Sequence, residues 1–316
     1  MKIPNYIRVK TKEMTMRTMS KSKPFDHALR ELTKAPLIAL PTLFLFIICL
    51  AILAIVDYCV ILGMIPLWVG MIINGFTIYF LFSPIHDASH GAFSQIKWIN
   101  EIPGHIGMIF FGPIAPFNLA RFIHMQHHRC TNEKENDPDY FGHKMDIFFP
   151  LRWSNFDYYY SKYFFLRASQ AMRKRLLPHL VIHFSAIIAV LAALIYFGYG
   201  LEALMLWILP TRISSFLFVS AFVFLPHEPF QSTAKENEYR ATNVRPGAEW
   251  LLTPLLAYQN YHLMHHLYPT APFYRMLKLW ELKHDQHVAN DPLIIKTFGL
   301  APIKNDQSKT TNDAST

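Results

Sequence analysis

Charged side chains are scarce in this chain: Asp, Glu, Lys and Arg make up 16% of its 316 residues. Soluble domains carry about 25%, so an ordinary soluble domain is excluded. Cysteine is also rare. Cys49, Cys59 and Cys130 are an odd number without the paired spacing of thiolate zinc sites, so neither a disulfide framework nor a cysteine zinc site is indicated.

Apolar residues are abundant. They make up 52% of the chain, and 15% of the residues are aromatic. The formal net charge is +8, yet the mean hydropathy is +0.17, so the basic side chains belong to an apolar body. Nucleic-acid binding is therefore excluded, since such a protein carries its cations as a stripe along a polar chain.

The two ends of the chain differ in composition from the middle. Residues 1–34 contain nine basic and three acidic side chains and no apolar h-region, so we expect a basic cytosolic segment and not a secretory signal. Residues 304–316 are polar and without periodicity, which predicts a disordered tail. Residues 35–303 are expected to form one membrane catalytic domain.

Two pairs of apolar runs predict two helical hairpins. Residues 37–56 and 58–85 lack charges and flank Asp57. Each run is long enough to cross a hydrocarbon layer of about 30 Å, and we expect the turn between residues 57 and 66. A second pair, residues 180–198 and 206–226, is joined by a Gly-Tyr-Gly turn. The fold class predicted is an all-α membrane protein with about four transmembrane helices.

Two features of these runs need an explanation. Arg212 lies within the last run, where a cation at the bilayer centre costs about 2.5–3.5 kcal/mol, and we expect it to snorkel beside Trp207. Residues 102–120 are apolar but contain three prolines. We interpret them as interfacial or re-entrant, because a full crossing would place the histidines on either side of them at opposite membrane faces.

Sixteen histidines are present, and eight of them fall in three short clusters just outside the predicted spans. The positive-inside rule assigns the chain termini and these clusters to the cytoplasmic side, where interfacial helices would form a histidine-rich cap. Residues three and four apart share a helix face, so each cluster presents two or three imidazoles to one side. The clusters are His86 and His90; His124, His127 and His128; and His262, His265 and His266.

Eight imidazoles exceed what one tetrahedral zinc ion binds, and the His-Glu-x-x-His pattern of zinc proteases is absent. Two metals are therefore implied. Imidazole suits zinc, copper, iron and nickel alike. An apolar body able to hold a long hydrocarbon favours iron, because two irons can use O2 and two electrons to attack an unactivated C–H bond.

The segments HDASHGAF, HMQHHRCTNEKENDPD and QNYHLMHHLYPTAPFYR resemble the three histidine boxes of the membrane fatty-acid desaturase and hydroxylase superfamily. Parts of the second and third are similar to its β-carotene hydroxylase branch. The resemblance implies a helical membrane domain under a cytosolic cap, with two iron ions bound by the eight clustered histidines. It also implies a further ligand after the last span, a place that His227 occupies.

Residues near the boxes receive separate interpretations. Asp87, Asp137 and Asp139 are expected to fix imidazole tautomers by accepting the outer N–H, with turn chemistry as the alternative for the last two. His284 and His287 are interpreted as a solvated helix face. His105, His143, His179 and His183 are taken as structural, Cys130 as a small filler, and residues 158–160 as an interfacial tyrosine belt.

The resulting hypothesis is an O2- and reductant-dependent oxidation of a long lipid taken from the bilayer. The substrate is an acyl lipid or, alternatively, the ring of a carotenoid, and the product a double bond or an alcohol. No flavin, nicotinamide or ferredoxin motif is evident, so an external ferredoxin or cytochrome is expected to supply electrons. A haem-binding electron carrier and a proton-relay transporter are the alternatives from other classes.

Overall fold

The computed structural model describes residues 27–303, and helices dominate it. The expectations for residues 1–26 of the basic segment and for the tail at 304–316 lie outside the described residues. Residues 27–33 are helical and lie against the cap, where Arg275 donates hydrogen bonds to the carbonyl groups of Glu31, Leu32 and Lys34.

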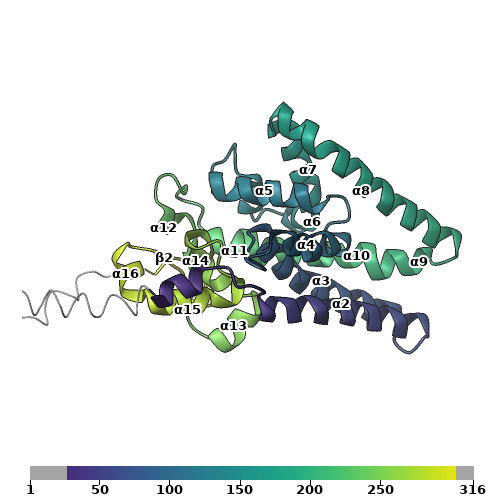
Figure 1. Ribbon diagram of the computed structural model, residues 1–316, viewed down its shortest axis with the longest axis horizontal. Coiled ribbons are helices and arrows are strands. Elements are labelled where there is room, and N and C mark those ends of the chain that lie inside the picture. The colour runs from purple at the N-terminus through teal and green to yellow at the C-terminus, as the bar shows by residue number, and fades with distance from the viewer. Residues whose placement is uncertain (1–26, 304–316) are drawn as a thin grey trace, which may run out of the picture.

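Within residues 27–303, four helices are long and apolar enough to cross a membrane, which confirms the predicted fold class. They form two hairpins: α2 (Leu40–Ile61) with α3 (Leu67–Ser89), and α8 (Gln170–Tyr196) with the helical stretch Gly200–His227. Both hairpin turns lie at one end of the molecule and the cap at the other (Figure 1). A helix of 22 residues is about 33 Å long, enough for the hydrocarbon layer.

Helix α8 begins ten residues before the apolar run that predicted it. The hydroxyl of Ser169 accepts a hydrogen bond from the amide of Met172 and caps the helix. The first turns therefore carry the basic residues 173–175, which a search for uncharged runs leaves out. Only 6% of the most apolar window of α8 is buried, against 56% for α3, so α8 presents most of its surface to lipid.

The last span is one continuous helix with two wide π-helical segments. Asn74 on α3 donates one hydrogen bond to the carbonyl of Leu206 in the first π segment and another to Asp57 on α2. This contact joins three spans. The parts of the helix are α9 (Gly200–Ala203), η2 (Leu204–Ile208), α10 (Leu209–Phe218), η3 (Val219–Phe224) and α11 (Leu225–His227).

Arg212 on α10 does not snorkel as expected. Its guanidinium donates to both carboxylate oxygens of Asp157, at 3.1 and 2.8 Å, and to the carbonyl of Ser154. Asp157 is buried. The cation is thus neutralised inside the protein by a residue 55 positions away in sequence, a contact that the sequence pattern does not reveal.

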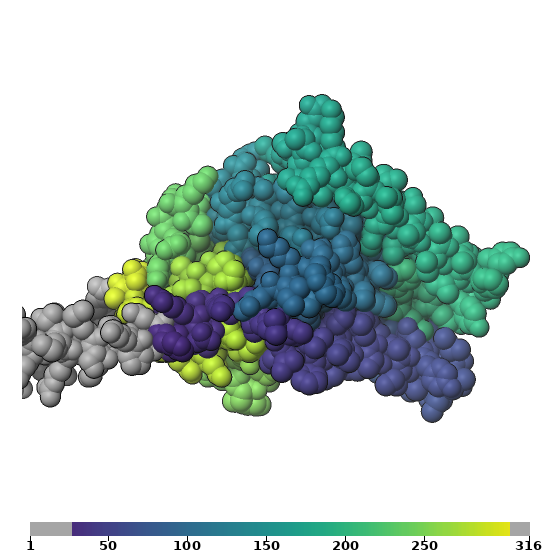
Figure 2. All heavy atoms as spheres, in the orientation of Figure 1, coloured from purple at the N-terminus to yellow at the C-terminus, as the bar shows by residue number. Residues whose placement is uncertain are grey.

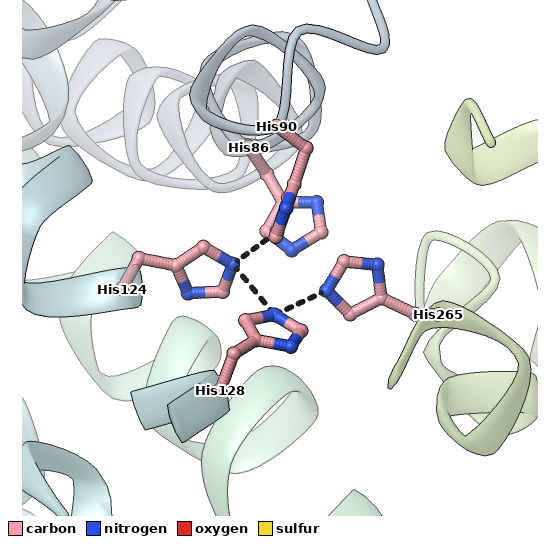
Figure 3. Close-up of side chains that lie close together, drawn as sticks. All are labelled: His86, His90, His124, His128 and His265. Carbon is pink, nitrogen blue, oxygen red and sulfur yellow. Dashed lines mark hydrogen bonds between the residues drawn. The ribbon is translucent and has the colours of Figure 1, made fainter. Parts of the chain in front are cut away.

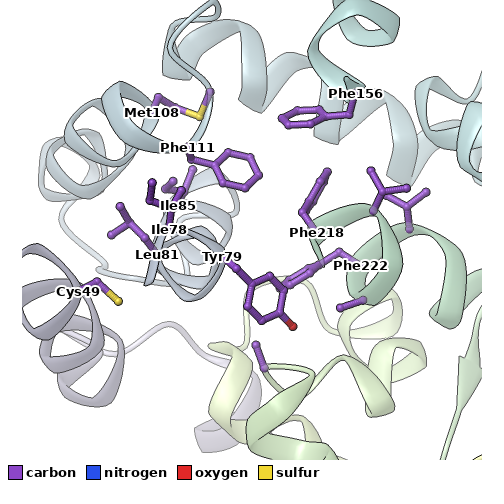
Figure 4. Close-up of a cluster of buried hydrophobic side chains, with 14 of the residues drawn as sticks. Cys49, Ile78, Tyr79, Leu81, Ile85, Met108, Phe111, Phe156, Phe218 and Phe222 are labelled. Carbon is purple, nitrogen blue, oxygen red and sulfur yellow. The ribbon is translucent and has the colours of Figure 1, made fainter. Parts of the chain in front are cut away.

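The proline-rich stretch enters and leaves the apolar body at the histidine end, as the re-entrant interpretation requires. It forms α4 (Lys97–Phe111) and α5 (Phe117–Cys130), joined by residues 112–116. A Cβ atom added to Gly104 would lie 2.2 Å from the ring of Phe117, so the two helices meet more closely than a side chain at this position permits. Helix α3 packs against α2, α4 and α10 around an aromatic core (Figure 4).

The cap consists of short helices and one small sheet. Its green to yellow atoms lie at the opposite end from the hairpin turns in Figure 2. Strands β1 (Asn243–Val244) and β2 (Leu293–Ile294) pair in parallel, with Asn243 opposite Leu293. Three short elements lie between α5 and α8 in the chain: η1 (Pro138–His143), α6 (Phe149–Ser154) and α7 (Phe156–Arg167). The helices that follow the last span are α12 (Glu238–Ala241), α13 (Glu249–Leu255), η4 (Gln259–Tyr261), α14 (His262–Leu267), η5 (Phe273–Arg275), α15 (Met276–Leu282) and α16 (His284–Ala289).

Candidate metal centre

The clustered histidines converge at the junction of the spans and the cap. Five of them form one group, in which each side chain offers a nitrogen within 4.8 Å of the others. The side chains come from α3, α5 and α14 and point toward one another (Figure 3). The Nε2 atoms of neighbouring rings lie 2.7, 3.2 and 2.8 Å apart in three successive pairs. The members are His86, His90, His124, His128 and His265.

A second group of four lies beside the first: His127, His227, His262 and His266. The rings of His128 and His266, one from each group, stack with their centroids 4.2 Å apart. In the second group, Nε2 of His262 lies 3.2 Å from that of His227 and 3.1 Å from that of His266. His227, the last residue of the fourth span rather than a residue after it, thus lies among the clustered histidines.

Helix geometry explains how the boxes are divided between the groups. On α5, His124 and His128 are one turn apart and face the first group, whereas His127 faces the second. On α14, His262 and His266 are one turn apart and face the second group, and His265 faces the first. Helices α5 and α14 therefore each contribute to both groups.

The nitrogen positions are compatible with metal ions as well as with hydrogen bonds. Two imidazole nitrogens that each lie about 2.1 Å from one ion at a right angle are about 3 Å apart. The contacts within the groups match this spacing. Nε2 of His127 and both ring nitrogens of His86 are buried without a hydrogen-bond partner among the described residues. Buried polar atoms are rarely left unpaired, so bound ions would account for Nε2 of His127 and for one of the two ring nitrogens of His86.

Burial and mutual repulsion keep most of these imidazoles neutral. Burial, together with neighbouring histidines, holds the pKa of each of the following well below its usual value: His90, His124, His128, His262, His265 and His266. A neutral imidazole has a free lone pair for a metal.

His127 is the exception. Burial lowers its pKa, but the carboxylates of Asp137 and Asp139 outweigh burial and raise the pKa to about 9. Its Nδ1 lies 2.9 Å from Asp137 and 3.5 Å from Asp139. Both carboxylates therefore lie where they can orient the ring, as predicted. Asp137 also accepts hydrogen bonds from the backbone N–H groups of Asn132 and Asp139, so it stabilises the turn in addition to contacting His127, and turn chemistry alone does not describe it.

The side-chain amides of two other residues lie where they can orient imidazole rings, and the sequence analysis did not identify them. Nδ1 of His262 contacts the side-chain oxygen of Gln259, and Nδ1 of His227 lies 3.2 Å from that of Asn132. Gln259 is three residues before His262, a spacing that could have revealed it. Asn132 is 95 positions from His227, and no local pattern relates the two.

The prediction for Asp87 was wrong. Its carboxylate accepts hydrogen bonds from the hydroxyl of Thr42 on α2 and from the backbone N–H of Phe273 in the cap, at 2.8 and 3.1 Å. It contacts no imidazole. Asp87 on α3 instead joins α2 and α3 to the cap.

The interpretation of His287 was also wrong. His284 is exposed as expected, but His287 is fully buried, and its ring stacks on Trp280 at an interplanar angle of 4°. It supports the packing of α16 on α15. The four histidines taken as structural, His105, His143, His179 and His183, lie outside both groups.

A narrow apolar cavity reaches the first group from the membrane domain. Ile85, Phe111 and Phe218 line it, and His124 lies on its wall. Tyr160, expected in an interfacial belt, also lines this cavity, and its hydroxyl donates to Asp139 at 2.6 Å. A chain of contacts thus runs from the cavity wall through Asp139 to His127.

Comparison with known proteins points to one family. An sn-1 oleoyl-lipid 12-desaturase of Picosynechococcus is 36% identical over 89 residues, 28% of this chain and 23% of that protein. A second one, of Synechocystis, is 26% identical over 66% of this chain and 64% of that protein. A β-carotene ketolase of Paracoccus is 29% identical over 62% of this chain and 72% of that protein.

The chain thus spans less than two thirds of the length of either desaturase, and somewhat more of the ketolase. The family described as fatty acid desaturase matches residues 62–296. This range covers three of the four spans and all nine clustered histidines. With the superfamily resemblance of the histidine boxes confirmed, the chain belongs to the fatty acid desaturase family.

Proposed function

We propose that this chain is a membrane-bound, non-haem di-iron oxidoreductase that uses O2 and external electrons to desaturate or hydroxylate a long-chain lipid. The observation that carries the proposal is the pair of adjacent, all-imidazole groups at the end of an apolar cavity. In this proposal each group holds one iron ion, with His86, His90, His124, His128 and His265 for one and His127, His227, His262 and His266 for the other.

The donor set supports iron in an oxidative role. Neutral imidazoles suit iron, copper and zinc, and family membership favours the redox-active choice. Bound iron would supply the oxidising power that removes hydrogen from an unactivated C–H bond. The protein's own share is to hold the ligands rigidly and to keep water away.

The cavity is suited to positioning an alkyl chain. Its lining is mainly apolar and aromatic, and it includes His124, a member of the first histidine group. Aromatic walls hold a chain by contact and exclude water, which would otherwise compete for the reactive position. We infer that the carbon to be oxidised lies beside His124.

An acyl lipid is the substrate that the comparisons favour most often, since two of the relatives are named for oleoyl-lipid desaturation. The carotenoid alternative also has support, because the β-carotene ketolase matches over a larger share of its own length. We retain the fatty-acyl substrate as the proposal and a carotenoid ring as the second candidate.

The proposal also includes the bounds of the catalytic domain, its orientation in the membrane and its source of electrons. Residues 35–303 form the catalytic membrane domain, and the basic leader places the chain termini and histidines on the cytoplasmic side by the positive-inside rule. Electrons come from a separate ferredoxin or cytochrome.

Expression in a host that accumulates β-carotene tests the substrate. Pigments and fatty acids from one culture are separated by chromatography and compared with those of a His265→Ala culture at equal protein level. We expect a new unsaturated or hydroxylated acyl chain that the variant lacks. A new oxygenated carotenoid with unchanged fatty acids would transfer the proposal to the second candidate, and no new product of either kind would contradict it.

A further inference from the structure

A second cavity lies in the membrane domain, at the end opposite the histidines. It measures about 410 Å³, within the usual range for ligand pockets. Helices α2, α4, α8 and the start of the last span surround it. The ends of the two hairpins stand on either side of this region in Figure 2. Neither the metal groups nor the first cavity shares a residue with it.

The polar residues of this cavity are gathered near the hairpin turns. Asp57 is four residues from the end of α2, and Glu202 is the third residue of α9. Both are therefore roughly 6 Å or less, along the helix, from the ends that meet the bilayer interface. The other end of the cavity is lined by apolar side chains such as Leu53, Ile109 and Leu206. The cavity thus has the polarity of an amphiphile lying along the membrane normal.

No cationic side chain in the wall of the cavity balances its two carboxylates. The lining includes two carboxylates and no Lys, Arg or His. One oxygen of Asp57 accepts from Asn74, but Oε2 of Glu202 is buried and has no hydrogen-bond partner among the described residues. Trp207, a donor in the wall, gives its N–H to the carbonyl of Ile109. The wall of the cavity therefore presents two carboxylate side chains and no cationic side chain, so a cationic group from outside the chain would be attracted to it.

We propose that this cavity binds an aminophospholipid, with its primary ammonium between Asp57 and Glu202 and one acyl chain along the apolar wall. An ammonium offers three N–H donors and a positive charge, which matches two carboxylates. An anionic headgroup would be repelled. A quaternary choline headgroup carries the charge but has no N–H to donate. The site goes beyond the proposed oxidation, since it involves neither the histidines nor O2.

The test compares lipids of different headgroup. The purified protein is placed in nanodiscs containing phosphatidylethanolamine, phosphatidylcholine and phosphatidylglycerol with identical acyl chains, then re-extracted, and the retained lipids are measured by mass spectrometry. We expect several-fold enrichment of phosphatidylethanolamine in the wild-type protein. The double variant Asp57→Asn/Glu202→Gln should lose this enrichment, and Asp285→Asn, an exposed carboxylate of the cap, should keep it.

A second variant protects the test against misfolding. Ala203→Phe fills the cavity and leaves both carboxylates in place, so it should also lose the enrichment. Equal retention of the three lipids by the wild type would overturn the proposal, as would enrichment that persists in both the double variant and Ala203→Phe. Because retention is measured without iron or turnover, its failure would leave the proposed oxidation untouched, and inactivity of the enzyme would leave the lipid site untouched.

Discussion

At the scale of the residue, His127 differs from the other clustered histidines in what lies behind it. Two buried carboxylates face its Nδ1, whereas amides face the corresponding atoms of His227 and His262. An anion behind an imidazole increases the basicity of the ring and fixes its tautomer. We therefore expect His127 to be the strongest donor of its group.

Replacement of Asp137 tests this expectation. Asp137→Asn keeps the size and the acceptor oxygen but removes the charge that faces His127 at 2.9 Å. Loss of such a partner typically costs 10–100-fold in metal affinity, and we expect a loss in this range. Iron retention against increasing chelator measures it, with the exposed neighbour Glu135→Gln as the matched control. Equal retention in both variants would contradict the assignment.

At the scale of the element, the close approach of α4 and α5 positions His124 beside the cavity. Because a Cβ at Gly104 would overlap the ring of Phe117, Gly104→Val should force the helices apart. Overpacking of this kind costs about 1–3 kcal/mol. We expect a lower midpoint of thermal unfolding in detergent, whereas Ile106→Val, on the lipid-exposed part of the same helix, should change it little. An unchanged midpoint for Gly104→Val would mean that this packing is not tight.

The ion pair between Arg212 and Asp157 joins α10 to α7. Arg212→Met leaves Asp157 buried without its partner, and breaking a buried pair costs about 3–5 kcal/mol. The double variant Arg212→Met/Asp157→Leu removes both charges, so we expect it to recover most of that stability. Thermal unfolding of both variants in one detergent gives the comparison. A double variant as unstable as the single one would show that the pair does not act through charge.

Much of this element arrangement was predictable from the sequence, and the exceptions have physical causes. Uncharged runs predicted the two hairpins, and the prolines at residues 102–120 indicated an interfacial or re-entrant segment, although not the two helices α4 and α5 that it contributes to. The start of α8 was missed, because a hydroxyl cap begins the helix in a basic stretch. The partner of Arg212 was missed, because Asp157 is remote in sequence and meets it only in the folded protein.

At the scale of the whole molecule, the two ends of the bundle have different chemistry. The histidines, the cap and the first cavity occupy one end, while the hairpin turns and two carboxylates occupy the other. Spacing along each helix predicted that every box presents imidazoles together. The one-turn spacing on α5 and α14 explains which imidazoles of a box act together, but which boxes share a group depends on the tertiary structure, which the sequence does not determine. The burial of His287 and the role of Asp87 likewise depend on how the cap packs.

The account depends on the two histidine groups holding two iron ions. Elemental analysis of the purified protein, grown with iron and extracted in detergent, tests this most directly. We predict two iron ions per chain and little zinc. In His265→Ala the iron content should fall, because one ligand of the first group is removed, although the variant still inserts in the membrane. Negligible iron with zinc in its place, or undiminished iron in the variant, would contradict the central claim.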